Sequence, residues 1–99
     1  MLNYEVLYII QNDIDDEQKA QVVEKFQSLV ESLGGSVESI EKWGTRKLAY
    51  PIDFKNAKRY EGYYVVMNFK AKEDVPAELD RQLRINDFVL RNMIVKKDA

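Results

Sequence analysis

The residues best suited to chemistry lie in one ten-residue stretch, residues 43–52, which reads WGTRKLAYPI. It places an indole ring, two adjacent cations and a tyrosine close together, without any Cys, His, Ser or carboxylate. Such a set lacks the commonest nucleophiles and general bases of enzymes, but it combines fixed positive charge with aromatic surfaces. Phosphate backbones are held by cations of this kind. The stretch therefore indicates a small RNA-associated structural protein rather than an enzyme.

The composition argues against several classes of catalytic and metal site. The chain of 99 residues contains no Cys and no His. Without thiols there is no disulfide and no thiolate metal site, and without imidazoles the usual general base and the commonest metal ligand are missing. We therefore expect no catalytic residues, no bound metal and no cofactor. The start of the chain lacks a signal-peptide pattern and no apolar run is long, which favours a soluble cytoplasmic protein.

The charges are unevenly distributed along the chain. The net charge is −2, from 15 basic and 17 acidic residues. Residues 13–31 contain six acids and two bases, a local charge of −4, whereas residues 42–60 contain six bases and one acid, a local charge of +5. Residues 81–97 contain five bases and one acid, a local charge of +4. This segregation predicts an acidic and a basic face, with chance clustering on a solvated surface as the alternative.

The first third of the chain reads as a strand followed by a helix. Residues 4–10 are rich in aromatic and β-branched side chains and too few for a typical helix, so they predict a strand. Asp15 and Gln18 have the spacing of a capping box, which explains the acids nearby better than a calcium loop does. Apolar residues then recur at helical spacing until a pair of glycines, beginning at Gly34, ends the helix.

The remainder of the chain alternates strand and turn signals around a second helix. Its strands and connection are expected over residues 37–49 (strand), 51–62 (a polar, basic connection), 63–69 (strand) and 88–95 (strand). The second strand should be kinked near Gly44. Asp74 is expected to cap the second helix, which has a proline in its first turn.

The resulting order, βαββαβ, predicts a ferredoxin-like α+β sandwich formed by all 99 residues as a single domain. In this arrangement two helices pack on one face of a four-stranded antiparallel sheet. Right-handed crossovers place the first and third strands at the centre of the sheet, and these are the two most apolar strands.

This fold hosts many functions, and three of them can be tested against the residues. A ferredoxin needs Cys ligands for its cluster, which are absent. An acylphosphatase-like enzyme needs a phosphate-binding loop after the first strand, where this chain has three acids and no Gly or Arg. An RNA-recognition motif needs stacking aromatics in the third strand, whose pattern here matches only superficially, since Tyr64 and Asn68 stand at mismatched positions.

Several segments together resemble the bacterial small-ribosomal-subunit protein six family. They are Tyr4-Glu5, residues 43–52, residues 62–69 (GYYVVMNF) and residues 83–87 (LRIND) followed by Arg91. The similarity covers essentially the whole chain. Its most specific part is residues 43–52, called the central motif here. The resemblance implies a ferredoxin-like fold, no catalytic activity, and binding to small-subunit ribosomal RNA together with a second protein, number eighteen of the same subunit. The chain lacks the Glu-rich tail of some relatives.

The basic residues of the central segment, with one from the last strand, are the candidate RNA-binding residues. They are Lys42, Arg46, Lys47, Lys55, Lys58, Arg59 and Arg91. Because Arg46 and Lys47 are adjacent on an expected strand, their side chains should point to opposite faces. Trp43 is more typical of a core or partner contact, and Tyr50 before Pro51 of a rigid exit from the strand.

Alternation along the strands also predicts a partner-binding face. If the most apolar set faces the helices, the opposite face receives a second group of mostly apolar residues: Leu7, Ile9, Tyr64, Val66, Met93 and Val95. Such a patch usually marks an interaction site, whereas a solvated antiparallel face is normally polar.

The alternative to a ribosomal RNA-binding function is a free-standing protein-interaction or small-ligand domain of the same fold, without RNA.

Overall fold

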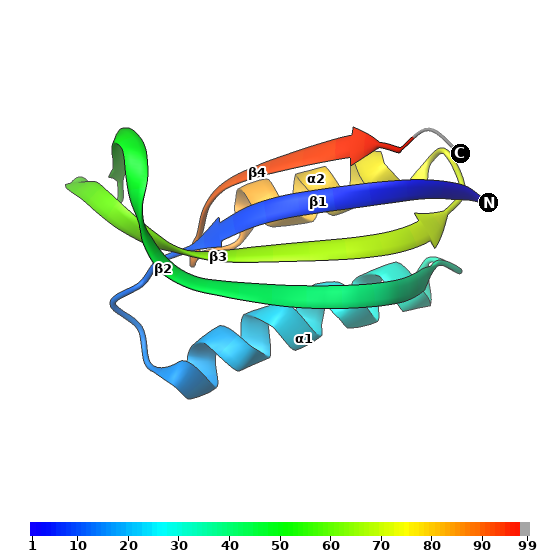
Figure 1. The fold of residues 1–99 in the computed structure, drawn as a ribbon, viewed down its shortest axis with the longest axis horizontal. Coiled ribbons are helices and arrows are strands. Elements are labelled where there is room, and N and C mark those ends of the chain that lie inside the picture. Colours follow the sequence, from blue (N-terminus) through cyan, green and yellow to red (C-terminus); the bar gives the residue numbers. More distant parts are fainter. Residues whose placement is uncertain (98–99) are drawn as a thin grey trace.

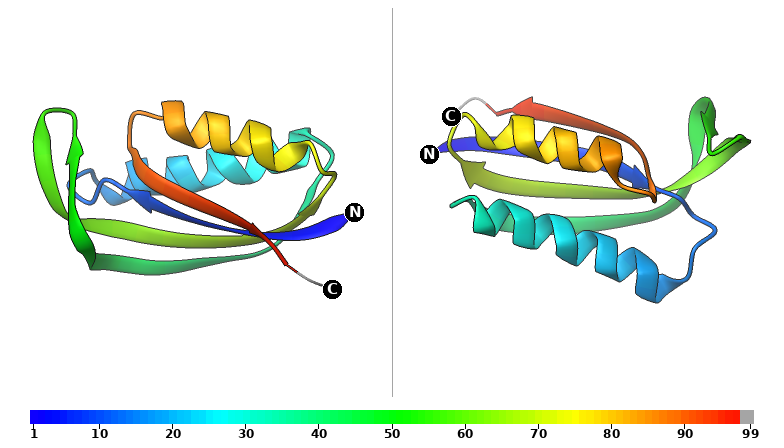
Figure 2. Two further views of the ribbon diagram at one scale, coloured as in Figure 1. Left: turned by 90° about the horizontal axis from the view of Figure 1, so that it is seen from above. Right: turned by 180° about the vertical axis from the view of Figure 1, so that it is seen from behind.

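The computed structural model describes residues 1–97 and arranges them as an antiparallel sheet with two helices on one face (Figures 1 and 2). The elements are β1 (Leu2–Ile10), α1 (Asp16–Ser32), β2 (Ser36–Phe54), β3 (Ala57–Ala71), α2 (Val75–Ile85) and β4 (Val89–Lys96). The strand order is β2-β3-β1-β4, which confirms the ferredoxin-like prediction and the central places of β1 and β3. Within residues 1–97, no helix has the length and apolarity needed to cross a membrane.

The ends of α1 follow the predicted signals. The Asp15 carboxylate accepts a hydrogen bond from the Gln18 backbone N–H at 2.7 Å, and the Gln18 side chain accepts from the Asp15 N–H at 3.4 Å. This capping box satisfies two backbone donors that the first helical turn leaves free. Gly34 then adopts a φ of +87° and the Gly35 N–H donates to the Val30 carbonyl at 2.9 Å, so the helix ends there.

The start of α2 differs from the prediction, because Asp74 forms no side-chain capping bond. An N-cap residue normally has an extended backbone, which brings its side chain near the free N–H groups. Asp74 instead has φ −84° and ψ −13°, a helical conformation, and the Val75 N–H donates to the Lys72 carbonyl in a preceding turn. Pro76, near the helix start, lacks an N–H, so one of the donors that Asp74 was expected to satisfy does not exist.

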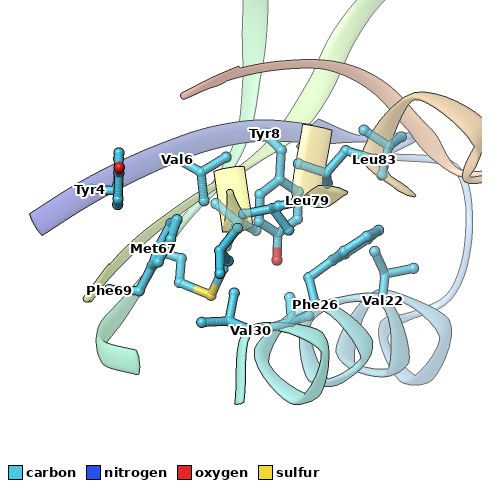
Figure 3. Close-up of a cluster of buried hydrophobic side chains, with 14 of the residues drawn as sticks. Tyr4, Val6, Tyr8, Val22, Phe26, Val30, Met67, Phe69, Leu79 and Leu83 are labelled. Carbon is cyan, nitrogen blue, oxygen red and sulfur yellow. The ribbon is translucent and has the colours of Figure 1, made fainter. Parts of the chain in front are cut away.

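The core lies between the sheet and the helices, and alternation along β1 determines which side chains enter it (Figure 3). Tyr4, Val6, Tyr8 and Ile10 are buried, whereas the residues between them are only half-buried. The helices contribute Val22, Val23, Phe26 and Val30 from α1, and Val75, Leu79 and Leu83 from α2. The Tyr8 and Phe26 rings meet edge to face, with centroids 5.6 Å apart at 62°.

The prediction of a connection over residues 51–62 is wrong, because β2 and β3 continue through it. They form a long hairpin whose two-residue turn, Lys55 and Asn56, has positive φ values of 52° and 60°, as in the tight turns that join twisted strands. Residues 48–60, called the hairpin arm here, extend past the rest of the sheet and bend out of its plane (Figures 1 and 2). Lys58 and Arg59 therefore lie on β3, and only Lys55 of the three expected loop cations lies in a turn.

The buried tyrosine of β1 predicts a specific loss of stability at alkaline pH. Burial, reinforced by the charge of Tyr63, raises the pKa of Tyr8, and its hydroxyl has no hydrogen-bond partner within residues 1–97. The unfolded chain releases this proton first, so the free energy of unfolding should fall by about 1.4 kcal/mol per pH unit above about pH 10. The variant Tyr8→Phe lacks this contribution. Urea unfolding at pH 8 and pH 11 measures the difference, and an equal alkaline loss in both proteins would contradict the assignment.

Candidate nucleic-acid and partner interface

The sheet face opposite the helices, called the open face here, carries the predicted second set of side chains. In the strand register Leu7 lies across from Val66 on β3 and Met93 on β4. Ile9 lies across from Tyr64 in the same way. Cross-strand partners share a face, and β1 buries the alternate residues under the helices. The register therefore confirms that these residues lie together on the open face.

The apolar side chains of the open face differ in how much surface they offer to a partner. Met93 is 58% exposed and Val95 is 42% exposed. Leu7 and Ile9 are half-buried, whereas Val66 is only 3% exposed although it lies on the face without helices. Val66 thus lies beneath the surface, and Met93 and Val95 are the most exposed members of the predicted set.

Three planar side chains gather at the β2 edge of the open face. Trp43 occupies an irregularity of the β2–β3 pairing between Lys42 and Gly44, where the predicted kink is found. Its ring lies parallel to that of Tyr64, with centroids 6.5 Å apart and 8° between the planes. The Arg46 guanidinium carbon lies 4.9 Å from the Trp43 ring centroid. Since Trp43 is still 43% exposed, this cluster presents a cation beside a flat apolar surface.

A second pair of the same kind connects the hairpin arm to β4. The Arg91 guanidinium lies 5.4 Å from the Tyr50 ring centroid, and its Nη1 donates a hydrogen bond to the Tyr50 hydroxyl at 3.2 Å.

At the base of the arm, β3 passes close to β1 at Gly62. A Cβ on Gly62 would come within 2.2 Å of the Ile9 Cγ2. Only glycine lets β3 pass Ile9 this closely, so Gly62 helps the hairpin to bend across the end of β1.

The structure does not gather all seven candidate RNA-binding cations on one face. Arg46 and Arg91 lie on the open face. Lys42 lies across from the core residue Val65, and thus on the face that carries the helices. Lys47, next to Arg46 in the strand, lies across from Glu61 on that same side.

The three remaining candidate cations belong to the hairpin arm. Lys55 lies at its turn, with the ammonium 5.5 Å from the ring centroids of Phe54 and Phe88, and Lys58 is exposed beside it. Arg59 is different, because its Nη1 donates to the Asp13 carboxylate at 2.8 Å and its side chain is only 17% exposed. The seven cations thus form a group on the open face, a group on the helix side and a group on the arm.

The Arg59–Asp13 pair gives Asp13 a role that the sequence did not indicate. The Arg59 hydrogen bond, with a second from Gln11, holds the pKa of the Asp13 carboxyl below its usual value. Sequence reasoning grouped Asp13 with the acids around the helix start and Arg59 with the free cations. The two residues are 46 positions apart, so no local pattern relates them.

Sequence reasoning did not identify which aromatic rings contact which arginines. Trp43 was expected in the core or against a partner, and Tyr50 was expected only to shape the end of a strand. In the structure Tyr50 is 61% exposed, and each ring is in contact with an arginine. The three-residue spacing between Trp43 and Arg46 gave a weak signal for the first contact. The second joins residues 41 positions apart and had none.

Comparison with known proteins supports one family consistently. The family profile described as Ribosomal protein S6 matches residues 3–96. The protein named "Small ribosomal subunit protein bS6" of Alkaliphilus metalliredigens (strain QYMF) is 48% identical over 96 residues, covering 97% of each chain. Its namesake from Clostridium novyi (strain NT) is 46% identical over 98 residues, covering 99% of each.

A solved structure agrees with these relatives. The crystal structure of 30S ribosomal protein S6 from Thermotoga maritima superposes with a TM-score of 0.88 at 27% identity, covering 97% of this chain and 87% of that one. With 97% of this chain covered, the likeness extends over nearly all of the fold. The chain belongs to the ribosomal protein S6 family, as a structural and non-catalytic protein of the small ribosomal subunit in the cytoplasm.

Proposed function

We propose that this chain binds small-subunit ribosomal RNA jointly with a second small protein, protein eighteen of the same subunit. The observation that carries this proposal is the composition of the open face. That face combines exposed apolar side chains on β4 with two arginines held against aromatic rings, Arg46 at its β2 edge and Arg91 on β4. A protein partner and a phosphate backbone require these two kinds of surface, respectively.

Docking of the partner is supported by the apolar part of the open face. An antiparallel sheet whose second face meets only water normally carries polar residues there. Here Met93 and Val95 are exposed, and Leu7, Ile9 and Tyr64 lie half-buried beside them. Covering about 300 Å² of this surface would contribute on the order of 7 kcal/mol before the costs of association. We assign the predicted interface set to the partner, with Val66 as its buried support.

Binding of RNA is supported by cations at the edge of the open face and on the arm. Arg46 lies at one edge of the open face, Arg91 lies near the base of the arm, and Lys55 and Lys58 lie at the tip of the arm, which bends toward the side of the sheet that carries the helices (Figure 2). Such cations can contact a phosphate backbone that passes the end of the sheet while the apolar surface contacts protein. Because the net charge is −2, the chain as a whole repels RNA, and these few cations must offset that repulsion. The partner should therefore supply part of the electrostatic attraction.

Reversing both bases of the central motif should weaken assembly with RNA much more than folding. Arg46→Glu with Lys47→Glu removes one cation from each face of β2, and each lost phosphate contact lowers the salt slope of binding by about 0.7–0.9. Filter binding of the chain, its partner and an RNA fragment from the small subunit, over a range of salt concentrations, measures this slope. An unchanged slope with normal folding would remove the motif from the RNA interface.

The matched control reverses two bases away from the proposed surface. Lys25→Glu on α1 with Lys72→Glu before α2 makes the same change in net charge at exposed positions. The control should keep the salt slope, because long-range repulsion is screened within about 10 Å at 0.1 M salt.

Co-sedimentation with small subunits through a salt wash tests the whole proposal, and consistent absence of the wild-type chain from the pellet would overturn it.

A further inference from the structure

We propose that the Arg59–Asp13 ion pair is a latch that fixes the hairpin arm in the orientation required for binding. Arg59 and Asp13 would then be positioning residues, and Arg59 would not be an RNA ligand. The inference deepens the proposed function and rests on it, since the arm carries part of the proposed RNA surface. It concerns a contact between the arm and the connection from β1 to α1, two segments far apart in the sequence.

The geometry of the pair is unusual for two residues on the outside of a small protein. The Arg59 Nη1 lies 2.8 Å from the Asp13 Oδ2, and the Arg59 side chain is only 17% exposed. Its Nε is buried and has no hydrogen-bond partner within residues 1–97. The Asp13 side chain is 56% exposed, so only the arginine has lost much of its hydration, and the pair is less screened than one in which both partners are exposed. An arginine awaiting a phosphate would instead keep its guanidinium accessible.

The location of the pair explains why the arm needs a latch. The arm is a two-stranded extension beyond the rest of the sheet, and such a ribbon is only marginally stable alone (Figure 1). Its side chains contact other parts of the chain from Arg59 to Asp13, from Tyr50 to Arg91 and from Lys55 to Phe88, and its Ile52 side chain is buried. The first of these contacts is an ion pair, and its cation is the least exposed of the three. Lys55, Lys58 and Tyr50 belong to the same hairpin, so the orientation that the ion pair favours sets where several of the proposed contacts lie.

The two roles of Arg59 predict opposite results for the change Asp13→Asn. This variant leaves the cation intact but removes the charge that holds it. If Arg59 binds RNA directly, Asp13→Asn frees it and binding should stay the same or tighten. If the pair is a latch, the arm samples other orientations, and apparent affinity falls in proportion to the competent fraction. A competent fraction of about one tenth would weaken binding about 10-fold.

Exchanging the two charges completes the test. Asp13→Arg combined with Arg59→Asp restores an ion pair across the same gap while it places an acid at position 59. The latch predicts recovery of affinity to within about 3-fold of wild type, whereas each single variant remains about 10-fold weaker. A direct RNA contact by Arg59 predicts that the exchange is as weak as Arg59→Asp alone, and that result would overturn the proposal. Glu78→Gln, which breaks a surface pair with Arg81, should change nothing.

A measurement without RNA separates the latch from the function on which it rests. Amide hydrogen exchange in the free chain should accelerate about 10-fold or more at Ile52 and Ala57, which lie in alternate pairs of the β2–β3 ladder, in Asp13→Asn, and return to the wild-type rate in the charge exchange. Exchange in α1 should stay unchanged. Normal arm exchange in Asp13→Asn would contradict the latch, whereas altered arm exchange in a chain that binds no RNA would contradict only the proposed function.

Discussion

A chain carrying Trp43→Ala and Met93→Ser should lose its affinity for the partner protein by about 100-fold or more while keeping its fold. The two side chains are 43% and 58% exposed and lie at different places on the open face. Large apolar side chains that a partner desolvates commonly contribute about 2 kcal/mol each, and 1.4 kcal/mol corresponds to a factor of ten. Because both are already partly solvated, the free energy of unfolding should fall by only about 1–2 kcal/mol. Calorimetric titration with purified partner measures the affinity.

A control variant distinguishes loss of a specific surface from loss of apolar surface in general. Leu33→Ser with Ile85→Ser removes two apolar side chains that are also exposed, at 38% and 63%, but that lie at the ends of the helices. It should bind the partner with wild-type affinity. Equal losses in both variants would mean that the partner contacts the helical layer, and unchanged affinity in the Trp43 and Met93 variant would exclude the open face.

The parts of the fold that were predictable are those with a repeating pattern. Alternation along β1 gave both faces of the sheet, because one face is buried and a shift of a single residue would expose it. The capping box at Asp15 and the stop at Gly34 were readable, since both depend on side chains close in sequence. The strand order followed from the handedness of the two crossovers, a property of the chain rather than of particular residues.

The hairpin arm was not predictable for a physical reason. It projects beyond the helices and buries only Ile52 of residues 48–60, so burial imposes little alternation on it, and its mixture of polar residues with a proline resembles a loop. Its turn has positive φ at Lys55, a residue that rarely marks such turns. The contacts that hold it, Arg59 with Asp13 and Tyr50 with Arg91, join residues more than 40 positions apart. The candidate site was therefore predictable in its apolar half and largely hidden in its cationic half.

The bulge at Trp43 shows how a small irregularity changes the chemistry of the open face. Strict alternation from Arg46, which lies across from Gly62, would not place Trp43 on the same face. The register shift between Lys42 and Gly44 lets the ring reach Tyr64 and the Arg46 guanidinium. Gly44 has a φ of +86°, a conformation that favours glycine, so it supports the irregularity that makes the Trp43 ring available for binding.

Phe26→Ala should do the opposite of the Trp43 and Met93 variant: it should lose much of its stability and keep the binding surface. The Phe26 side chain is fully buried between α1 and the sheet, against the Tyr8 ring (Figure 3). Removing it leaves a cavity and should lower the free energy of unfolding by about 3–5 kcal/mol, a large share of the 5–15 kcal/mol typical of a domain. Urea unfolding measures the loss. The milder Phe26→Leu, at about 1–2 kcal/mol, serves if the alanine variant does not fold.

The partner should stabilise the Phe26 variants much more than the Trp43 and Met93 variant, because the sheet lies between the core and the binding surface. Partner at 100 times its dissociation constant stabilises a folded chain by about 2.7 kcal/mol. The Phe26 variants keep the open face, so they should gain the same amount as wild type. The Trp43 and Met93 variant, bound about 100-fold more weakly, should gain only about 0.4 kcal/mol. A Phe26 variant that stays folded but gains nothing from the partner would show instead that packing under the helices controls the shape of the open face.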